Sequence, residues 1–477
     1  THGAPRTGGT RGTVGTRGPR PARIEGVEGT PTSPHGPNRR GRAPGRKVDA
    51  SHGVPLDDAG GLALHPGAPA GESSGSVTLR RMWTFSPTAG SLAESQTLAI
   101  TAAAKRMRAA GLEVAPFAAG EPDFDTPAYI RDAGIAAIRE GKTRYAPAAG
   151  IAPLRESIAA DLESQGYEGL TPDRTIVSVG AKGVLYLALD VLLEPGDEVL
   201  VPAPYWLSYP KMIQAAGGAT VVVESRDDFV IDVERIRAAI TPKTRAIIVN
   251  SPSNPSGAVQ PDDVQAEIGR IAVEHDLAVI SDEIYSHLTY APARFRSFAA
   301  LAPEAHEHTL LVNGVSKAYA MTGWRIGYGG GPKDLIQRMT RLQSHATSGT
   351  PEICQRAALA ALEGPQDDIA RMQAIFAQRR QVICEELARI PGLNCRVPEG
   401  AFYVFPDISM YLGKSYRGRT VDSASTLAEM LIEYAHAAVV PGDVFHAPYA
   451  IRFSYACSEE HIRAGVGRVA DFLSQLV

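Results

Sequence analysis

The 477-residue chain is longer than one hydrophobic core usually organises, so its length predicts two folded domains. Hydrophobic residues make up 44% and charged residues 21%, and no apolar run is long enough to span a bilayer, which argues against a membrane protein. The four cysteines stand far apart without a C-x-x-C pair, so we expect no disulfide framework and no metal site. This cysteine usage favours a reducing compartment, and we expect a cytoplasmic protein.

The first 81 residues differ in composition from the rest of the chain. Residues 1–50 hold ten Lys/Arg against three Asp/Glu, although the whole chain has a formal net charge of -4. The segment is rich in Gly, Pro and Arg and shows no apolar period, so residues 1–81 are expected to be a disordered N-terminal extension. Three interpretations stay open: an organelle-targeting peptide, translated sequence upstream of a natural start at Met82, or a basic nucleic-acid arm. We favour the second, and expect no nucleic-acid partner, because the arginines have no aromatic neighbours.

From residue 98 onward the sequence has the periodicity of a folded protein. An amphipathic helix is predicted at 98–110, and a Gly-Glu-Pro-Asp-Phe-Asp-Thr-Pro loop follows at 120–127. Apolar runs then alternate with helical stretches, which is typical of a mostly parallel sheet covered on both faces. The expected strands are 175–179, 198–201, 220–223, 246–249 and 278–281, and the expected helices between them include 183–193 and 261–275.

The last part of the chain has a different pattern. After Gly364 a long charged helical stretch, strands at 401–405 and 450–454 and a terminal helix predict a smaller α+β domain. We therefore expect an N-terminal arm and first part of the small domain at 82–125, a large domain at 126–364 and the C-terminal small domain at 365–477.

The segment from Asn313 to Tyr328 carries the strongest chemical signal. Lys317 stands between small residues in an otherwise apolar stretch, where a lysine amine is desolvated and becomes nucleophilic toward an aldehyde. Arg325 follows eight residues later and suits a phosphate through paired hydrogen bonds. Any single lysine or arginine is more often a solvated charge, so the combination carries the inference.

The stretch from Gly314-Val-Ser-Lys317 to Arg325-Ile-Gly327 resembles the cofactor-attachment motif of class I aminotransferases. The likeness extends from about Ser91 to the C-terminus. It is strongest to a bacterial subgroup in which Tyr-Ala-Pro-x-x-Gly, Pro-Tyr-Trp-x-Ser-Tyr-Pro and Asn-Pro-x-Gly occur in this order, as here. The resemblance implies an α/β fold of the aspartate aminotransferase type (PLP transferase type I), with a mostly parallel seven-stranded sheet and a smaller α+β domain. It also implies pyridoxal 5'-phosphate (PLP) as cofactor and a homodimer with shared sites.

The resemblance also implies which residues contact the cofactor. Lys317 would carry PLP covalently, and Asp282 would keep its pyridine nitrogen protonated. Tyr285 and Asn254 would hydrogen-bond its phenolic oxygen, and Trp206 would stack on its ring. Tyr145 would reach the cofactor phosphate of the neighbouring subunit. Further cofactor contacts are expected from Gly180, Ala181, Lys182, Ser316 and Arg325, of which the first three stand at a strand-to-helix turn that suits a phosphate.

Substrate contacts are implied in the same way. Arg452 would form a two-pronged pair with the substrate α-carboxylate, and Gly120 would offer a backbone contact. Lys182 would bind the distal carboxylate of an acidic substrate, where Ser95 and Thr97 would add hydrogen bonds. Trp206 and Asn254 complete the expected substrate site.

Two positions depart from the family pattern. Gly314 stands where many relatives have a phosphate-binding Ser, and Asn254-Pro-Ser-Gly replaces the commoner Asn-Pro-Thr-Gly. Neither change removes a group that the chemistry needs.

The expected activity is ping-pong transamination between aspartate or glutamate and a 2-oxo acid, oxaloacetate or 2-oxoglutarate, with Lys317 as anchor and then as proton carrier. An aromatic or prephenate aminotransferase and a β-lyase or amine-cyclising enzyme on the same scaffold remain alternatives. A transcription regulator with an aminotransferase-like sensor domain is disfavoured, because residues 1–81 lack the periodicity of a helical DNA-binding module.

Overall fold

The computed structural model describes residues 83, 86, 90, 92 and 96–477 of the chain. The expected extension at 1–81 and the proposed start at Met82 lie outside the described residues, as do Ser95 and the side chain of Thr97. Among the helices that the structure describes, none is long and apolar enough to cross a membrane.

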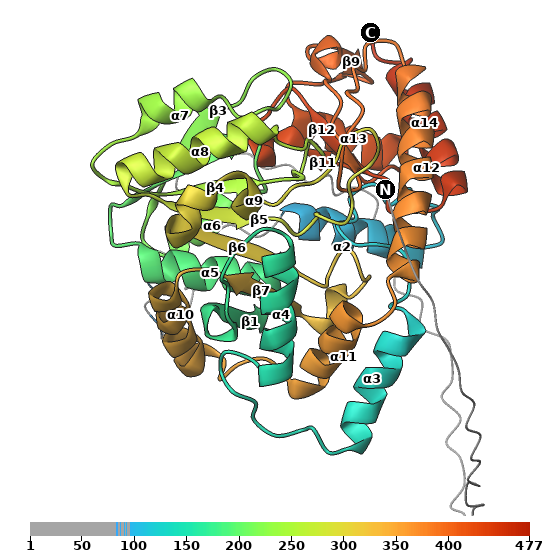
Figure 1. The fold of residues 1–477 in the computed structure, drawn as a ribbon. Coiled ribbons are helices and arrows are strands. Elements are labelled where there is room, and N and C mark those ends of the chain that lie inside the picture. The colour runs from blue at the N-terminus through green and yellow to red at the C-terminus, as the bar shows by residue number, and fades with distance from the viewer. Residues whose placement is uncertain (1–82, 84–85, 87–89, 91, 93–95) are drawn as a thin grey trace, which may run out of the picture. The chain divides into compact units, whose positions relative to one another are not determined.

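A seven-stranded sheet organises the middle of the chain, in the order β1-β7-β6-β5-β4-β2-β3 (Figure 1). Within this sheet β7 runs antiparallel to both its neighbours, and the other strands are parallel to one another. The predicted mostly parallel seven-stranded sheet is therefore confirmed. Its strands are β1 Thr175–Val179, β2 Glu198–Ala203, β3 Ala219–Glu224, β4 Thr244–Asn250, β5 Ala278–Asp282, β6 Thr309–Gly314 and β7 Ile326–Gly330.

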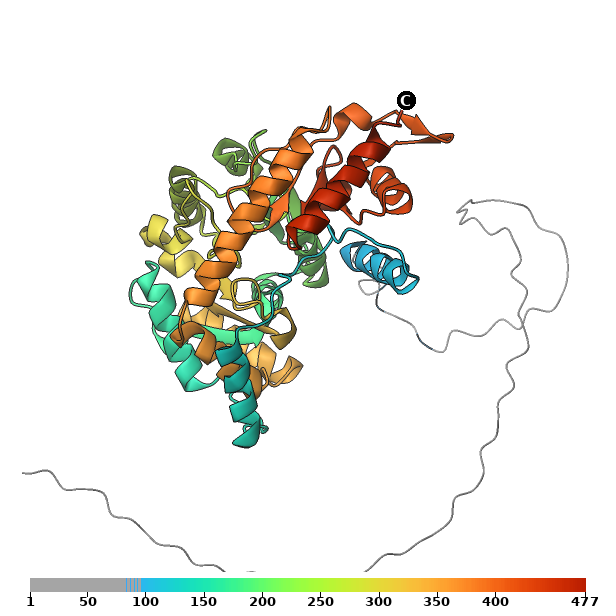
Figure 2. The same cartoon turned by 90° about the vertical axis from the view of Figure 1, so that its right-hand side faces the viewer.

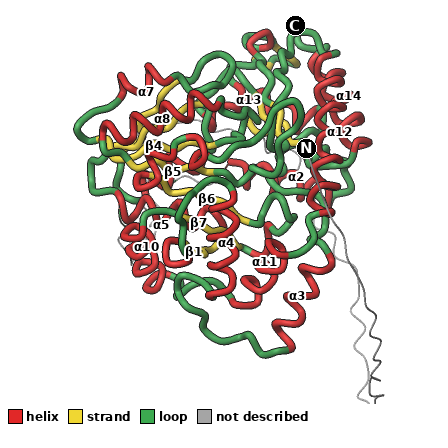
Figure 3. The backbone as a smooth tube through the Cα atoms, viewed as in Figure 1, coloured by secondary structure: helices red, strands yellow, loops and turns green. Residues whose placement is uncertain are grey.

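Helices cover both faces of this sheet, as Figure 3 shows with the strands enclosed between them. In β4, Ala246 and Ile248 pack in one apolar core, while Ile247 and Val249 pack in the other, because successive side chains point to opposite faces. Burial on both faces explains why the strands are continuous apolar runs. One face is covered by α5 (Gly180–Leu192), α6 (Ser208–Ala215) and α10 (Lys333–Ala346), and the other by α3 (Ala128–Arg139), α4 (Ala152–Ser164), α7 (Val233–Ala239), α8 (Asp262–His275), α9 (Phe298–Leu301) and α11 (Glu352–Glu363).

The C-terminal residues build a separate apolar core with a three-stranded antiparallel sheet in the order β11-β12-β8. Phe117 belongs to this core, so residues that precede the large sheet in the chain contribute to it together with residues that follow it. The long helix α12 (Asp367–Ala388) begins in the core of the large sheet with Ile369 and continues into the C-terminal core with Phe376. It runs beside α14 (Glu459–Leu473) in Figure 2. The other elements here are α2 (Gln96–Ala109), β8 (Tyr403–Val404), β9 (Ser415–Tyr416), β10 (Arg419–Thr420), α13 (Ala424–Tyr434), β11 (Val440–Pro441) and β12 (Ile451–Ser454).

Two predicted boundaries were wrong. The strand expected at 401–405 is reduced to Tyr403–Val404, because Ala401 adopts a left-handed conformation with φ 57° and cannot continue an extended strand. The helix expected from Gly183 begins at Gly180, so the predicted turn at 180–182 is the first turn of α5. This shift places the free backbone N–H groups of the helix directly at the end of β1.

Candidate active site

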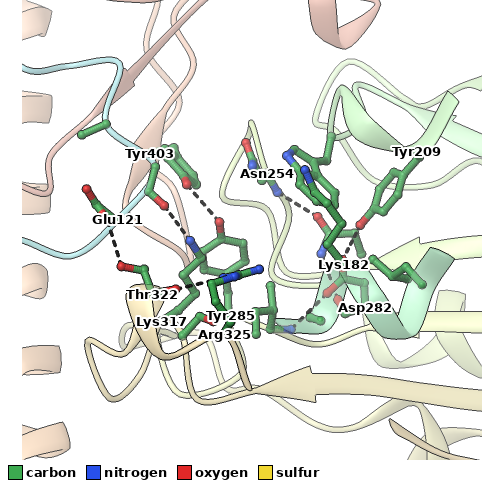
Figure 4. Close-up of a pocket in the computed structure, with 18 of the residues that line it drawn as sticks. Glu121, Lys182, Tyr209, Asn254, Asp282, Tyr285, Lys317, Thr322, Arg325 and Tyr403 are labelled. Atoms are coloured by element: carbon green, nitrogen blue, oxygen red, sulfur yellow. Dashed lines mark hydrogen bonds between the residues drawn. The ribbon is translucent and has the colours of Figure 1, made fainter. Parts of the chain in front are cut away.

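A cavity of about 440 Å³ lies at the edge of the sheet where the parallel strands end (Figure 4). β4 ends at Asn250 and β5 at Asp282, while Lys317 follows β6, so all three side chains meet at this edge. Arg325 joins them because it precedes β7, and the antiparallel strand starts where its neighbours end. The topology thus gathers residues that are far apart in sequence around one cavity.

Lys317 lies half-buried in the wall of the cavity. Its Nζ donates a hydrogen bond to the carbonyl oxygen of Gly120 at 2.6 Å. Burial lowers the pKa of the Lys317 amine to about 8, against the opposing charge of Glu121. About a tenth of this amine is therefore neutral and nucleophilic at pH 7, far more than for a free lysine.

Asp282 is a buried carboxylate, 3% exposed, at the end of β5. Its Oδ2 accepts a hydrogen bond from Tyr209 Oη at 2.7 Å, and its Oδ1 accepts one from the Ile284 N–H at 3.3 Å. Burial raises the pKa of Asp282 to about 6. Asp282 forms no ion pair with a described residue, so a cationic N–H donor in the cavity would stabilise its charged form.

The start of α5 is arranged to bind an anion. The N-cap residue of α5, Val179, has no side chain that can accept a hydrogen bond from the helix, so N–H groups of the first turn stay available. Arg325 lies against this turn, donating to the carbonyl oxygens of Thr322 at 2.9 Å and Val179 at 3.4 Å. Gly180 permits this approach, since it has φ +73° and a Cβ there would lie 2.4 Å from Arg325 Nη2. The helix start and the guanidinium together form a cradle that could hold a phosphate.

Lys182 and Trp206 form the next part of the wall. The Lys182 ammonium lies over the Trp206 indole, 4.7 Å from the ring centroid, although the residue as a whole is exposed. Burial of the ammonium, and then the charge of Arg325, lower the pKa of Lys182. Lys182 forms no hydrogen bond or ion pair with a described side chain.

Arg452 adjoins the cavity from β12 and is 2% exposed. Its Nη1 donates to Asn254 Oδ1 at 2.8 Å and its Nη2 to the Ala118 carbonyl oxygen at 3.3 Å, while its buried Nε has no partner. No carboxylate among the described residues pairs with it. Because Asn254 Oδ1 accepts from Arg452, the Asn254 NH₂ group remains as a donor.

The structure brings nearly all the predicted site residues together. Gly180 and Arg452 touch residues of the wall, whereas Tyr145 is 94% exposed and does not reach the cavity of its own chain. The cavity is lined by Gly120, Ala181, Lys182, Trp206, Asn254, Asp282, Tyr285, Ser316, Lys317 and Arg325.

Nine further lining residues were not predicted: Thr101, Ala119, Glu121, Leu185, Tyr209, Asn250, Ile284, Thr322 and Tyr403. Tyr209 had a usable signal, because it follows Trp206 by three residues in the same motif. Glu121 and Thr322 meet through a 2.8 Å hydrogen bond between loops that no local pattern connects.

Gly314, the departure from the family motif, has a steric reason. It is paired in register with Gly327 of β7, and a Cβ on Gly314 would lie 2.9 Å from the Gly327 Cα. A serine would not fit here without moving the two strands apart.

Comparison with known proteins identifies the family of this chain. The family model for aminotransferase class I and II matches residues 113–469. The chain belongs to this family. An aspartate aminotransferase of Geobacillus stearothermophilus is 45% identical over 385 residues, which cover 80% of this chain and 97% of the relative. An aspartate/prephenate aminotransferase of Thermus thermophilus is 44% identical over 386 residues, covering 80% of this chain and 96% of the relative. The solved aspartate aminotransferase of Thermus thermophilus with maleate superposes with a TM-score of 0.77 at 42% identity, covering 82% of this chain and all of that structure.

Class I and II aminotransferases use PLP, and the cavity of this aminotransferase fits that group. The uncapped start of α5 with Arg325 suits the phosphate, and the unpaired Asp282 carboxylate suits a protonated ring nitrogen. Trp206 offers an aromatic face, and Lys317 supplies the amine for covalent attachment. The phosphate, ring nitrogen, ring face and aldehyde of PLP would therefore each have a partner of the right kind in the cavity.

Proposed function

We propose that this aminotransferase transfers the amino group between aspartate or glutamate and a 2-oxo acid, oxaloacetate or 2-oxoglutarate, by a ping-pong mechanism. The observation that carries the proposal is a set of unmatched positive charges. Arg325, Arg452 and Lys182 all line or adjoin one cavity, and none of them pairs with a carboxylate of a described residue.

These three cations match the anions of a loaded site. Arg325 lies at the phosphate cradle, which leaves Arg452 and Lys182 for the substrate. A buried guanidinium without a counter-charge is costly, so Arg452 favours a ligand that brings a carboxylate. Lys182 offers a second, mobile cation for a side-chain carboxylate. An amino acid with two carboxylates therefore uses both charges.

The chain's residues have separate tasks in this reaction. PLP, when bound, supplies an electron sink for the negative charge that develops at the substrate α-carbon. Asp282 would accept the N–H of the ring nitrogen and so keep it protonated, and Tyr209 donates a hydrogen bond that holds the Asp282 carboxylate in position. Lys317 Nζ, once released from the cofactor, takes the proton from the substrate α-carbon, and its burial favours the neutral amine that this task needs. Arg452 and Lys182 bind the two carboxylates and orient the α-proton toward Lys317.

A prephenate aminotransferase is the second candidate. Relatives from Thermus thermophilus and Aquifex aeolicus carry the name aspartate/prephenate aminotransferase, at 44% and 43% identity. Prephenate also has two carboxylates, so it satisfies the same pair of cations, and the exposed, flexible Lys182 side chain can move to admit its ring.

The assembly, domain division and location are proposed as well. Tyr145 carries a large aromatic ring that is 94% exposed in the single chain, which supports a homodimer in which it reaches the partner's cofactor phosphate. The cores on the two faces of the large sheet support a large domain at 126–364, and the separate C-terminal core supports a small domain built from 82–125 and 365–477. A cytoplasmic location remains our expectation from the cysteine usage.

A panel of amino-acid donors tests the proposal. The PLP-loaded protein is mixed with each donor alone, and conversion of the aldehyde form of the cofactor to the amine form is followed by absorbance. We expect aspartate and glutamate to convert it fastest. Fast conversion by aromatic or alanine donors, with slow conversion by aspartate, would overturn the assignment of an acidic substrate.

A further inference from the structure

Tyr403 occupies a central place in the site although no sequence motif singled it out. It stands on the short strand β8, is 1% exposed, and lines the cavity. Its hydroxyl lies 2.9 Å from the hydroxyl of Tyr285, and either oxygen can be the donor (Figure 4). Its ring lies beneath the Arg452 guanidinium, whose carbon is 4.3 Å from the ring centroid. One side chain thus contacts both the proposed cofactor partner Tyr285 and the proposed substrate partner Arg452.

These two contacts use different parts of the Tyr403 side chain. The ring face supports the guanidinium and needs only an aromatic residue. The hydroxyl serves Tyr285 and needs an O–H group. Burial raises the pKa of both tyrosines, so both hydroxyls keep their protons at neutral pH. When Tyr285 donates its hydrogen toward the cavity, Tyr403 is the group that donates to the Tyr285 oxygen.

We propose that Tyr403 is a positioning residue that joins the two halves of the site, holding Arg452 in place through its ring and strengthening the Tyr285 hydrogen bond to the cofactor through its hydroxyl. This inference rests on the proposed roles of Tyr285 and Arg452. Hydrogen bonds in a chain polarise one another, by about 10–30% per bond, so donation from Tyr403 makes Tyr285 a better donor to the phenolic oxygen. A better donor stabilises the negative charge on the phenolic oxygen. The nitrogen that joins Lys317 to the cofactor then loses its proton at a lower pH.

The surroundings of this chain of contacts contain several charges. The effect of one hydroxyl on the titration of the bound cofactor can be measured only if these charges stay the same. The test therefore uses substitutions that neither add nor remove a charge. The titratable and charged groups around it are Glu121, Lys182, Asp282, Lys317, Arg325 and Arg452.

The test compares Tyr403→Phe with Tyr403→Leu in the PLP-loaded full chain. Tyr403→Phe removes only the hydroxyl, so the midpoint of the pH titration of the bound cofactor's visible absorbance should rise by about 0.3 to 0.6 pH unit. Its KM for aspartate should stay within about twofold, because the ring remains under Arg452. Tyr403→Leu removes both contacts, and it should also raise the KM for aspartate about fivefold or more.

A double-mutant cycle and a matched control complete the design. In a Tyr285→Phe background, Tyr403→Phe should shift the midpoint no further, because the hydroxyl acts through Tyr285. Tyr455→Phe is the control, since Tyr455 is buried and donates to the Ala401 carbonyl oxygen at 3.1 Å outside the cavity. It should move neither the midpoint nor the KM.

Each alternative outcome contradicts the inference. An unchanged midpoint in fully loaded Tyr403→Phe, an equal shift in Tyr455→Phe, or an equal shift with Tyr285 absent would each show that the hydroxyl does not act through Tyr285. An unchanged KM for aspartate in Tyr403→Leu would show that the ring does not support Arg452. If Tyr403→Leu does not fold, Tyr403→Phe and the cycle decide the role of the hydroxyl, and Tyr403→Met, which also lacks an aromatic face, decides the role of the ring through the same KM. A wild-type protein that fails to take up PLP would instead refute the proposed function itself.

Discussion

Replacing Lys182 by alanine removes the cation that we assign to the distal carboxylate of the substrate. The contact it would make is a charge-assisted hydrogen bond, typically about 1.5 to 3 kcal/mol. The lower half of this range applies, because Lys182 is exposed as a residue and its charge is partly screened by solvent. We therefore expect kcat/KM for aspartate to fall about 10- to 40-fold, since ~1.4 kcal/mol corresponds to a factor of ten.

The assay measures kcat/KM for aspartate and for phenylalanine with one 2-oxo acid acceptor. Phenylalanine has no distal carboxylate, so its value should change less than about threefold. Lys211→Ala is the matched control, because Lys211 is an exposed lysine on α6 that does not line the cavity. Equal losses for both donors would show that Lys182 serves the cofactor phosphate, and the argument for an acidic substrate from paired cations would fail.

Three further results are expected. Because burial lowers the pKa of the Lys317 amine to about 8, the rate at which cofactor-free protein attaches PLP should rise with pH through a midpoint near 8; a midpoint near that of a free lysine would contradict this. Arg379 donates to both carboxylate oxygens of Asp123, at 2.6 and 2.9 Å, so Arg379→Ala should lower the free energy of unfolding in urea by about 2 to 4 kcal/mol. Arg338 pairs with Asp334 in an exposed ion pair, so Arg338→Ala should change this free energy little. Deleting residues 1–81 should leave activity within about twofold, because 82% of the chain covers the whole of a solved relative; a large loss of activity or a change of size-exclusion mass would show that the segment contributes.

Local pattern was sufficient wherever a functional residue stands directly beside a strand or in a motif. Asp282 ends the apolar run expected at 278–281, whereas Lys317 was found from its motif, because the strand before it was not among the expected strands. The structure shows that this strand, β6, runs parallel to β5, which brings Lys317 and Asp282 to one edge of the sheet. The pattern also predicted that both faces of the sheet are buried, because strands covered on both sides have continuous apolar sequences.

Contacts made by docking of distant segments were beyond the reach of local pattern. Tyr403 meets Tyr285 across 118 residues, and no periodicity connects them. The strand that carries Tyr403 was predicted too long, because Ala401 adopts a left-handed conformation. Alanine rarely adopts this conformation, so the sequence does not indicate it and tertiary contacts must impose it. Glu121 was missed for the same reason, since its hydrogen bond with Thr322 and its charge interaction with Lys317 both join segments about 200 residues apart.

Covalent trapping of the cofactor tests the central claim most directly. The PLP-saturated protein is reduced with borohydride, digested, and mapped for the labelled peptide. We predict a single label on Lys317, in the peptide that also holds Ser316. A label on another lysine, or no label in saturated protein, would contradict the account, because Lys317 would then neither carry the cofactor nor lie where it can move the substrate α-proton.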